Sequence, residues 1–183
     1  MRIDKALKVI DRLEGTLIAD LKSLKVIAQE RLADKLLQEK MPGAFNFAIF
    51  LTGLVACETL GYFINPDSKE GDTKKNIEYF IASMYFESRD LNKKNYIDAL
   101  IFLRTNLAHV YGMTDFRLNE VEKELILCVG APSAPMIISD QRKVKLNGIK
   151  FIELIVKAFD SIKSAVSSSK NESSIAKVIS EKP

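Results

Sequence analysis

The strongest constraint on the fold is a run of 21 residues, 44–64, in which Glu58 is the only charged side chain. A run of this length can cross a bilayer as a single helix. However, a charge well inside a lone span costs about 2.5–3.5 kcal/mol on insertion scales, and no second span accompanies this one. The run also contains Asn46, Thr52 and Thr59. We therefore expect the central helix of a soluble bundle, apolar on all sides, with no membrane contact.

Further helices are expected on both sides of this run. Apolar residues recur at intervals of three and four over residues 3–39, where Gly15 marks either a kink or a break between two helices. The central helix is bounded by Pro42-Gly43 and by Asn65-Pro66, which cannot continue it. The same spacing predicts helices over about 73–86, with Asp72 or Thr73 as its cap, and over about 93–111 and 149–166.

The segment before the last long helix differs in character. Residues 125–129 are a short β-like run, and residues 136–138 and 144–146 flank a polar stretch, so a small β-hairpin is expected within about 125–147. A serine-rich polar segment follows, and residues 167–183 are expected to be a flexible tail. The predicted fold is therefore mainly α: one domain over residues 1–166, an up-and-down bundle of four to five core helices with this insert.

Composition excludes several classes of site. The net charge of +3, from 27 basic and 24 acidic residues, is too small to indicate nucleic-acid binding by itself. Cys57 and Cys128 lie in apolar surroundings and are expected to be buried, reduced thiols of a cytoplasmic protein. With one histidine no ordinary zinc site can be assembled, so no metal or cofactor is expected. A glycine-rich phosphate loop and a nucleophilic triad are both missing from the sequence.

The helix expected over residues 93–111 carries the chemistry of interest. Arg104 and the single histidine, His109, are five residues apart and therefore about 140° apart around the helix. They flank a face formed largely by small residues, which include Thr105 and Ala108. Small residues allow a second backbone to approach closely. Packing a second copy there would bring two arginines and two histidines towards one cleft, so a homodimer is expected.

Two segments resemble the HEPN (higher eukaryotes and prokaryotes nucleotide-binding) family. Arg104-Thr105-Asn106-Leu107-Ala108-His109 matches the Arg-x4–6-His motif of these helical bundles, and Ala56-Cys57-Glu58-Thr59-Leu60-Gly61 is similar to a helix found in uncharacterised microbial members. The resemblance covers about residues 44–165. It implies a dimer that acts on RNA, either as a metal-independent endoribonuclease or as a binding-only relative. Thr105 departs from the Asn, Asp or His that often follows the arginine in active members.

The residue types fit this chemistry. An imidazole with an unperturbed pKa near 6.5 can remove a proton from the 2′-hydroxyl of RNA or return one to the leaving oxygen. The Arg104 guanidinium can bind the phosphate, and Asn106 or Thr105 can orient it. Glu58 needs a partner inside its apolar helix, and Arg104 is the candidate, although Arg104 can also pair with Asp98.

A different class of function competes with this interpretation. His109 near a helix end is also typical of a capping or packing residue, and Arg104 then serves only as an ion-pair partner. The chain would then be a non-catalytic helical module that dimerises or docks a partner through the small-residue face. An antitoxin-like protein partner is compatible with either function.

Overall fold

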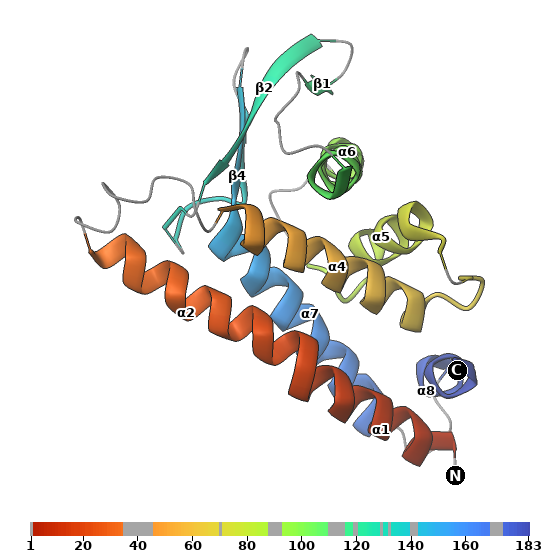
Figure 1. Cartoon of the computed structure of the whole chain (residues 1–183). Coiled ribbons are helices and arrows are strands. Elements are labelled where there is room, and N and C mark those ends of the chain that lie inside the picture. Colours follow the sequence, from red (N-terminus) through yellow and green to blue (C-terminus); the bar gives the residue numbers. More distant parts are fainter. Residues whose placement is uncertain are drawn as a thin grey trace.

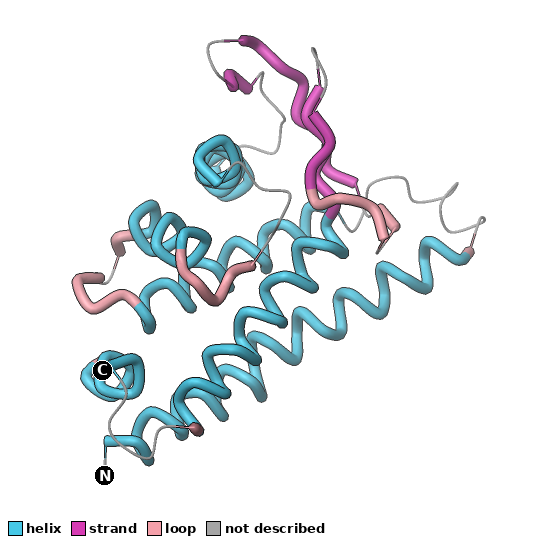
Figure 2. The backbone as a smooth tube through the Cα atoms, turned by 180° about the vertical axis from the view of Figure 1, so that it is seen from behind, coloured by secondary structure: helices cyan, strands magenta, loops and turns pink. Residues whose placement is uncertain are grey.

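The computed structural model describes residues 2–34, 46–69, 71–87, 93–109, 116–118, 121–128, 130–131, 133–139, 143–168 and 174–183. The fold is mainly helical, as the sequence predicted. Figure 1 shows the helices packed side by side, with the strands beyond one end of them and both chain ends at the other. Figure 2 shows the same separation of helices and strands from behind.

The first helical segment is one continuous rod. Helices α1 (Arg2–Leu13) and α2 (Ala19–Ala33) are joined without a break by the π-helical turn η1 (Glu14–Ile18). Such turns occur as local bulges inside α-helices. Gly15 lies in this turn, and a Cβ atom there would meet nothing within 4 Å. Residues 2–33 therefore form one rod with a bulge rather than two separate helices. The predicted end of this helix, residues 35–39, lies outside the described residues.

Helix α4 (Asn46–Ile64) is the central element that the apolar run predicted. It packs against α5 (Thr73–Ala82), α6 (Lys93–His109) and α7 (Gly148–Ser167). It ends where the ring of Pro66 prevents the helix from continuing. Among the described helices, α4 has the length and composition to cross a membrane, a weak criterion for a single helix. Half of its apolar window is buried inside the fold, as expected for a core helix.

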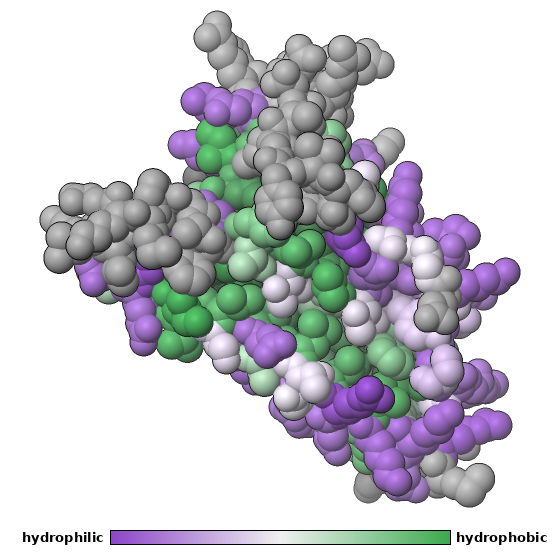
Figure 3. All heavy atoms as spheres, viewed as in Figure 1, coloured by the Kyte–Doolittle hydropathy of each residue, from purple (hydrophilic) through white to green (hydrophobic). Residues whose placement is uncertain are grey.

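The core lies between α4, α7 and the α1–α2 rod. Phe50 of α4 stacks on Phe151 of α7, with ring centroids 5.8 Å apart. Gly53 makes room for the same ring, because a Cβ atom at this position would lie 2.7 Å from Cε1 of Phe151. Burial of these apolar faces provides the main driving force for folding. Figure 3 shows apolar side chains gathered in the middle of one face, with polar side chains around its rim.

The segment before α7 is a mixed sheet rather than the single small hairpin that was predicted: residues 137–139 and 144–146 do lie in an antiparallel pair, but residues 121–128 add a parallel strand that was not expected. Strands β1 (Phe116–Leu118), β2 (Val121–Cys128), β3 (Ile137–Ser139) and β4 (Lys143–Asn147) have the order β1-β2-β4-β3. Strand β2 runs parallel to β4, whereas β3 is antiparallel to β4. A parallel pair needs a crossover rather than a tight turn, and residues between Cys128 and Lys143 provide it.

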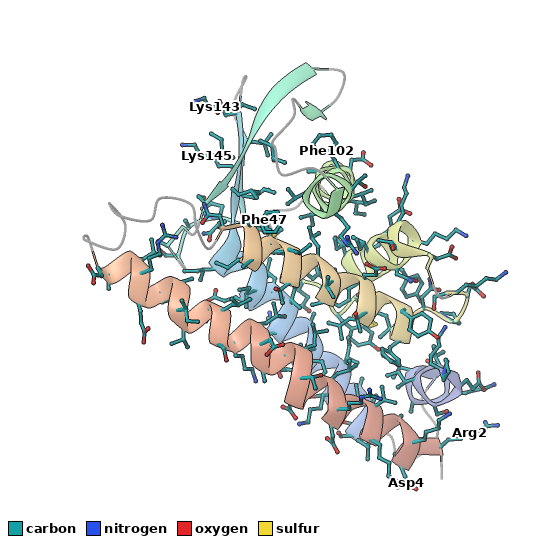
Figure 4. The ribbon with its side chains drawn as sticks, viewed as in Figure 1. Arg2, Asp4, Phe47, Phe102, Lys143 and Lys145 are labelled. Atoms are coloured by element: carbon teal, nitrogen blue, oxygen red, sulfur yellow. The ribbon has the colours of Figure 1, made fainter. Side chains whose placement is uncertain are left out.

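Burial alternates along β4, as expected for a strand with one buried face. Val144 and Leu146 are buried, and Lys143 and Lys145 are exposed. Figure 4 shows both lysines projecting away from α6.

The last ten residues are also not the polar tail that the serine-rich composition predicted. Helix α8 (Ser174–Glu181) packs against α1, α4 and α7, and it buries Ile175, Ala176 and Ile179. Its apolar residues recur at helical spacing, which allows one face to be covered. Lys182, directly after α8, is only 8% exposed.

Candidate functional site

Three helices meet at the carboxylate of Glu58. Oε1 of Glu58 accepts a hydrogen bond from Oγ1 of Thr73 at 2.5 Å, and Oε2 accepts one from Nη2 of Arg104 at 3.3 Å. The side chains of Glu58 and Arg104 are 23% and 24% exposed. The expectation that Arg104 satisfies the charge of Glu58 is confirmed, and Glu58 rather than Asp98 is its carboxylate partner. The ion pair therefore links α4 to α6, and Thr73 adds the start of α5.

Gly61 explains how α5 comes so close to this carboxylate. A Cβ atom at position 61 would lie 1.9 Å from the backbone oxygen of Asn76, which no side chain can tolerate. Glycine therefore allows the backbone of α5 to pack directly on α4. Asp72 is the N-cap of α5 but makes no capping hydrogen bond through its side chain. Thr73 donates its hydroxyl to Glu58 instead, so the predicted capping role is filled by neither side chain.

A cavity of about 510 Å³ opens beside the ion pair. Its lining includes Glu58, Tyr62, Asn76, Arg104 and Pro183. Two buried polar atoms of these lining residues, Nε of Arg104 and Oδ1 of Asn76, have no hydrogen-bond partner within the part of the chain that the structure describes. Asn76 is only 2% exposed. Buried polar atoms almost always have a hydrogen-bond partner. Two without one, on residues that line the same cavity, therefore mark a candidate ligand site.

The C-terminal segment forms one border of this cavity. The Lys182 ammonium group lies 4.7 Å from the ring centroid of Tyr62 and donates to the carbonyl and hydroxyl oxygens of Ser68, at 3.1 and 2.6 Å. These contacts fix one side of the Tyr62 ring and place Pro183 at the cavity wall. The ring of Phe63 packs against Tyr62 edge to face, with centroids 5.3 Å apart.

Asn76, Thr73 and Tyr62 were missed as site residues in the sequence. A usable indication existed for Asn76, which lies four residues before Phe80 and hence on the buried stripe of α5. A polar residue at such a position needs a partner. Tyr62 and Thr73 carried no comparable indication, because their positions depend on how α5 and the C-terminal segment pack against α4.

The predicted supporting residues on α6 are only partly placed. Thr105 is exposed, and its hydroxyl donates to the carbonyl of Ile101 at 3.1 Å, within its own helix. His109 is the last residue of α6, about 7.5 Å along the axis from Arg104 by helix geometry. The side chains of Asn106 and His109 lie outside the described residues. The geometry thus brings Arg104 together with Glu58 and leaves the role of His109 as a prediction.

The cysteines are not activated nucleophiles. Cys57, the residue before Glu58, is fully buried, and this burial raises the pKa of its thiol well above the ordinary value of 9.0. Burial also raises the pKa of the half-buried Cys128 thiol, which donates to the carbonyl of Leu146 at 3.2 Å. Among the described residues, no group of His, Cys, Asp and Glu is arranged to hold a metal ion.

Comparison with known proteins adds no assignment to this geometry. No protein-family model matches the chain, and neither a curated protein nor a solved structure is significantly similar to it. The chemistry of the site is therefore argued from its own residues.

Proposed function

We propose that the chain is a cytoplasmic, HEPN-like helical bundle that binds RNA, and that Arg104 and His109 form a metal-independent endoribonuclease site across a homodimer. The observation that carries the proposal is the position of Arg104. Its guanidinium group lines the 510 Å³ cavity, is oriented by Glu58 through one nitrogen, and has a second nitrogen, Nε, that no described residue satisfies. A guanidinium group held in this way is suited to bind a phosphate.

The proposed reaction uses one histidine from each subunit. One His109 imidazole removes the proton of the 2′-hydroxyl, and O2′ attacks the adjacent phosphorus. The bond from phosphorus to O5′ breaks, and the second His109, as imidazolium, donates a proton to O5′. The products are a 2′,3′-cyclic phosphate and a 5′-hydroxyl. Arg104 stabilises the negative charge that grows on the non-bridging oxygens, and Glu58 positions Arg104.

The test is cleavage of a labelled RNA by the purified chain in the presence of EDTA. We expect products that end in 2′,3′-cyclic phosphate, and a loss of about 100–1,000-fold in rate for Arg104→Ala, the range for removal of one charge-stabilising donor. His109→Ala is expected to lose at least as much. Arg104→Lys keeps the charge but not the planar fork, so it should recover only part of the rate.

Lys74→Ala is the matched control for the loss of one positive charge. Lys74 lies on α5, its side chain is 67% exposed, and its ammonium group forms an ion pair with Glu78 of the same helix. Its loss should leave the cleavage rate within about twofold, since an exposed pair of this kind contributes little. If the folded chain neither cuts nor binds RNA, or if Arg104→Ala behaves like Lys74→Ala, the proposal is wrong.

The second candidate is a non-catalytic dimerisation or docking module, with an antitoxin-like protein as one candidate partner. Thr105 favours it, because this residue is exposed and donates its hydroxyl within α6 rather than towards the cavity. In that case Ala108→Phe should abolish self-association in sedimentation experiments, and His109→Ala should leave it unchanged. For the ribonuclease, Ala108→Phe should abolish association and cleavage together.

A further inference from the structure

We propose that the cavity beside Arg104 is a base-binding subsite that prefers nucleobases carrying an exocyclic amino group. The inference rests on the proposed RNA function, because it takes the phosphate bound at Arg104 as the anchor of the nucleotide. It goes further by assigning the neighbouring cavity to a base and by naming the chemistry that selects that base.

The selection follows from the acceptor groups of two residues that line the cavity, Asn76 and Glu58. Oδ1 of Asn76 is buried, accepts hydrogen bonds and has no donor among the described residues. The carboxylate of Glu58, paired with Arg104, also only accepts, and a carboxylate can accept more hydrogen bonds than the two from Thr73 and Arg104. A ligand that pairs with these two acceptors must carry a hydrogen-bond donor. An exocyclic amino group of cytosine or adenine offers two N–H bonds, whereas the corresponding position of uracil is a carbonyl oxygen.

The size and the lining of the cavity are compatible with a nucleobase. Its volume of about 510 Å³ lies within the range of about 300–1,000 Å³ that is typical of small-molecule sites. Tyr62 and Phe63 line it together with the aliphatic side chain of Val55. Single-stranded RNA is commonly recognised by stacking of an unpaired base on aromatic side chains and by hydrogen bonds to the base edge.

The Tyr62 ring is held in place before any ligand binds. The Lys182 ammonium group lies over it at 4.7 Å, and Lys182 is in turn fixed by Ser68. A ring held in this way offers a base a rigid contact with little loss of side-chain freedom on binding. In this arrangement Arg104 would hold the phosphate, and Tyr62 would contact its base, since both residues line the same cavity.

The test compares the binding of labelled oligo(C) and oligo(U), which differ in the amino or carbonyl group at one ring position and in the proton of the adjacent nitrogen. Affinities are measured by fluorescence anisotropy at one fixed salt concentration, because phosphate contacts make binding salt-dependent. We expect the full chain to bind oligo(C) at least fivefold more tightly than oligo(U). Asn76→Leu should remove this preference by weakening oligo(C) alone, and Asn76→Asp, which keeps an acceptor, should retain it. Tyr62→Leu should weaken both oligomers about equally.

The outcomes separate this inference from the function on which it rests. If the folded chain binds neither oligomer, the proposed RNA function fails and the base site with it. If it binds both with equal affinity, or if Asn76→Leu keeps the preference, the base site is wrong while RNA binding stands. The comparison of the two oligomers on the unmodified chain needs no variant, so it decides the matter even if Asn76→Leu does not fold.

Discussion

Two asparagine side chains are buried to almost the same depth, but their polar atoms are satisfied very differently. Asn147, 3% exposed, precedes α7: its Oδ1 accepts from the backbone N–H of Lys150 at 3.2 Å, and its Nδ2 donates to the carbonyl of Ala131 at 2.8 Å. Asn76, 2% exposed, leaves Oδ1 without a partner among the described residues and lines the cavity beside Arg104. The surroundings of Asn147 are complete, and those of Asn76 lack a donor.

The close packing around each asparagine serves a different purpose. At Gly130, which has a φ of +53°, a Cβ atom would lie 2.5 Å from Cγ of Asn147, so the loop closes tightly on the capping side chain. At Gly61 the close approach involves the backbone of Asn76 and brings α5 onto α4, beside the cavity that Asn76 helps to line. A buried polar residue with all its bonds made serves the structure, and one with a bond missing beside a cavity is a candidate for binding a ligand.

The largest effect on stability is expected for Asn147→Ala. The change removes the side-chain cap of α7, worth about 1 kcal/mol, and the bond from Nδ2 to the carbonyl of Ala131, worth about 0.5–1.5 kcal/mol because that carbonyl still accepts from the backbone N–H of Ala134 at 3.0 Å. We expect the free energy of unfolding to fall by about 1.5–2.5 kcal/mol, measured by urea unfolding followed by circular dichroism. RNA cleavage by the folded fraction should not change.

Asn147→Asp is the control for this prediction. It keeps an oxygen to accept from Lys150 but loses the donor to Ala131, so its loss of stability should be intermediate. Surface substitutions typically change stability by less than about 0.5 kcal/mol. A loss that small for Asn147→Ala would contradict the structural role given to Asn147.

The next effect concerns the ion pair at the candidate site. Glu58→Ala leaves Nη2 of Arg104 and the hydroxyl of Thr73 without their acceptor. Both charged side chains are about one quarter exposed, so the cost is below that of a fully buried pair, and we expect about 1–2 kcal/mol in the same unfolding experiment. Thr73→Val, which removes only the hydrogen bond, should cost less. Equal losses would show that the contact with Arg104 contributes nothing to stability.

Asn76→Ala tests whether the Asn76 side chain, unlike that of Asn147, contributes little to stability. The substitution removes a buried oxygen that has no partner in the described structure. The loss of packing contacts destabilises the fold, whereas removal of the unpaired oxygen relieves a desolvation cost, so the two effects partly cancel. We expect the free energy of unfolding to stay within about 1 kcal/mol of the unmodified chain. If Asn76→Ala instead costs as much as Asn147→Ala, the two asparagines have the same structural role and the cavity loses its main indication of a ligand.

The sequence predicts what depends on local signals and fails where distant segments must meet. Helix α4 was predictable because an apolar run is bounded by Pro42 and by Pro66, and the pairing of Glu58 with Arg104 followed because a lone charge in an apolar helix needs a partner.

The missed features have non-local causes. The parallel pairing of β2 with β4 joins segments across a crossover, which turn residues do not encode. Helix α8 follows a serine-rich stretch whose composition resembles a tail, and its stability comes from packing on α1. The close contact of Gly61 with the backbone of Asn76, beside the cavity, likewise joins two helices whose packing the local sequence does not encode.

The smallest expected effect uses the two cysteines, one in each region, as reporters. Cys57 precedes Glu58 and is fully buried, whereas Cys128 pairs with Asn147 in the β2–β4 register and is half-buried. Because only the thiolate reacts, the exposed fraction and the raised pKa values predict faster labelling of Cys128 by a disulfide-exchange reagent at about pH 8. Cys128→Ser isolates the slow reaction of Cys57, and bound RNA should slow that reaction further. Labelling of Cys57 at the rate of Cys128 would contradict the burial on which this order depends.

The same thiol gives a pH dependence with a defined sign. Burial raises the pKa of Cys57 in the folded chain above its ordinary value of 9.0, so the thiol is protonated when folded and ionises more readily when unfolded. Its contribution to stability is therefore fully present below about pH 9 and is lost as the pH rises towards the folded pKa. We expect the urea midpoint to fall above about pH 9, and to fall less in Cys57→Ala, which has no thiol to ionise. If the urea midpoint falls equally in both proteins, ionisation of Cys57 does not cause the loss of stability at alkaline pH.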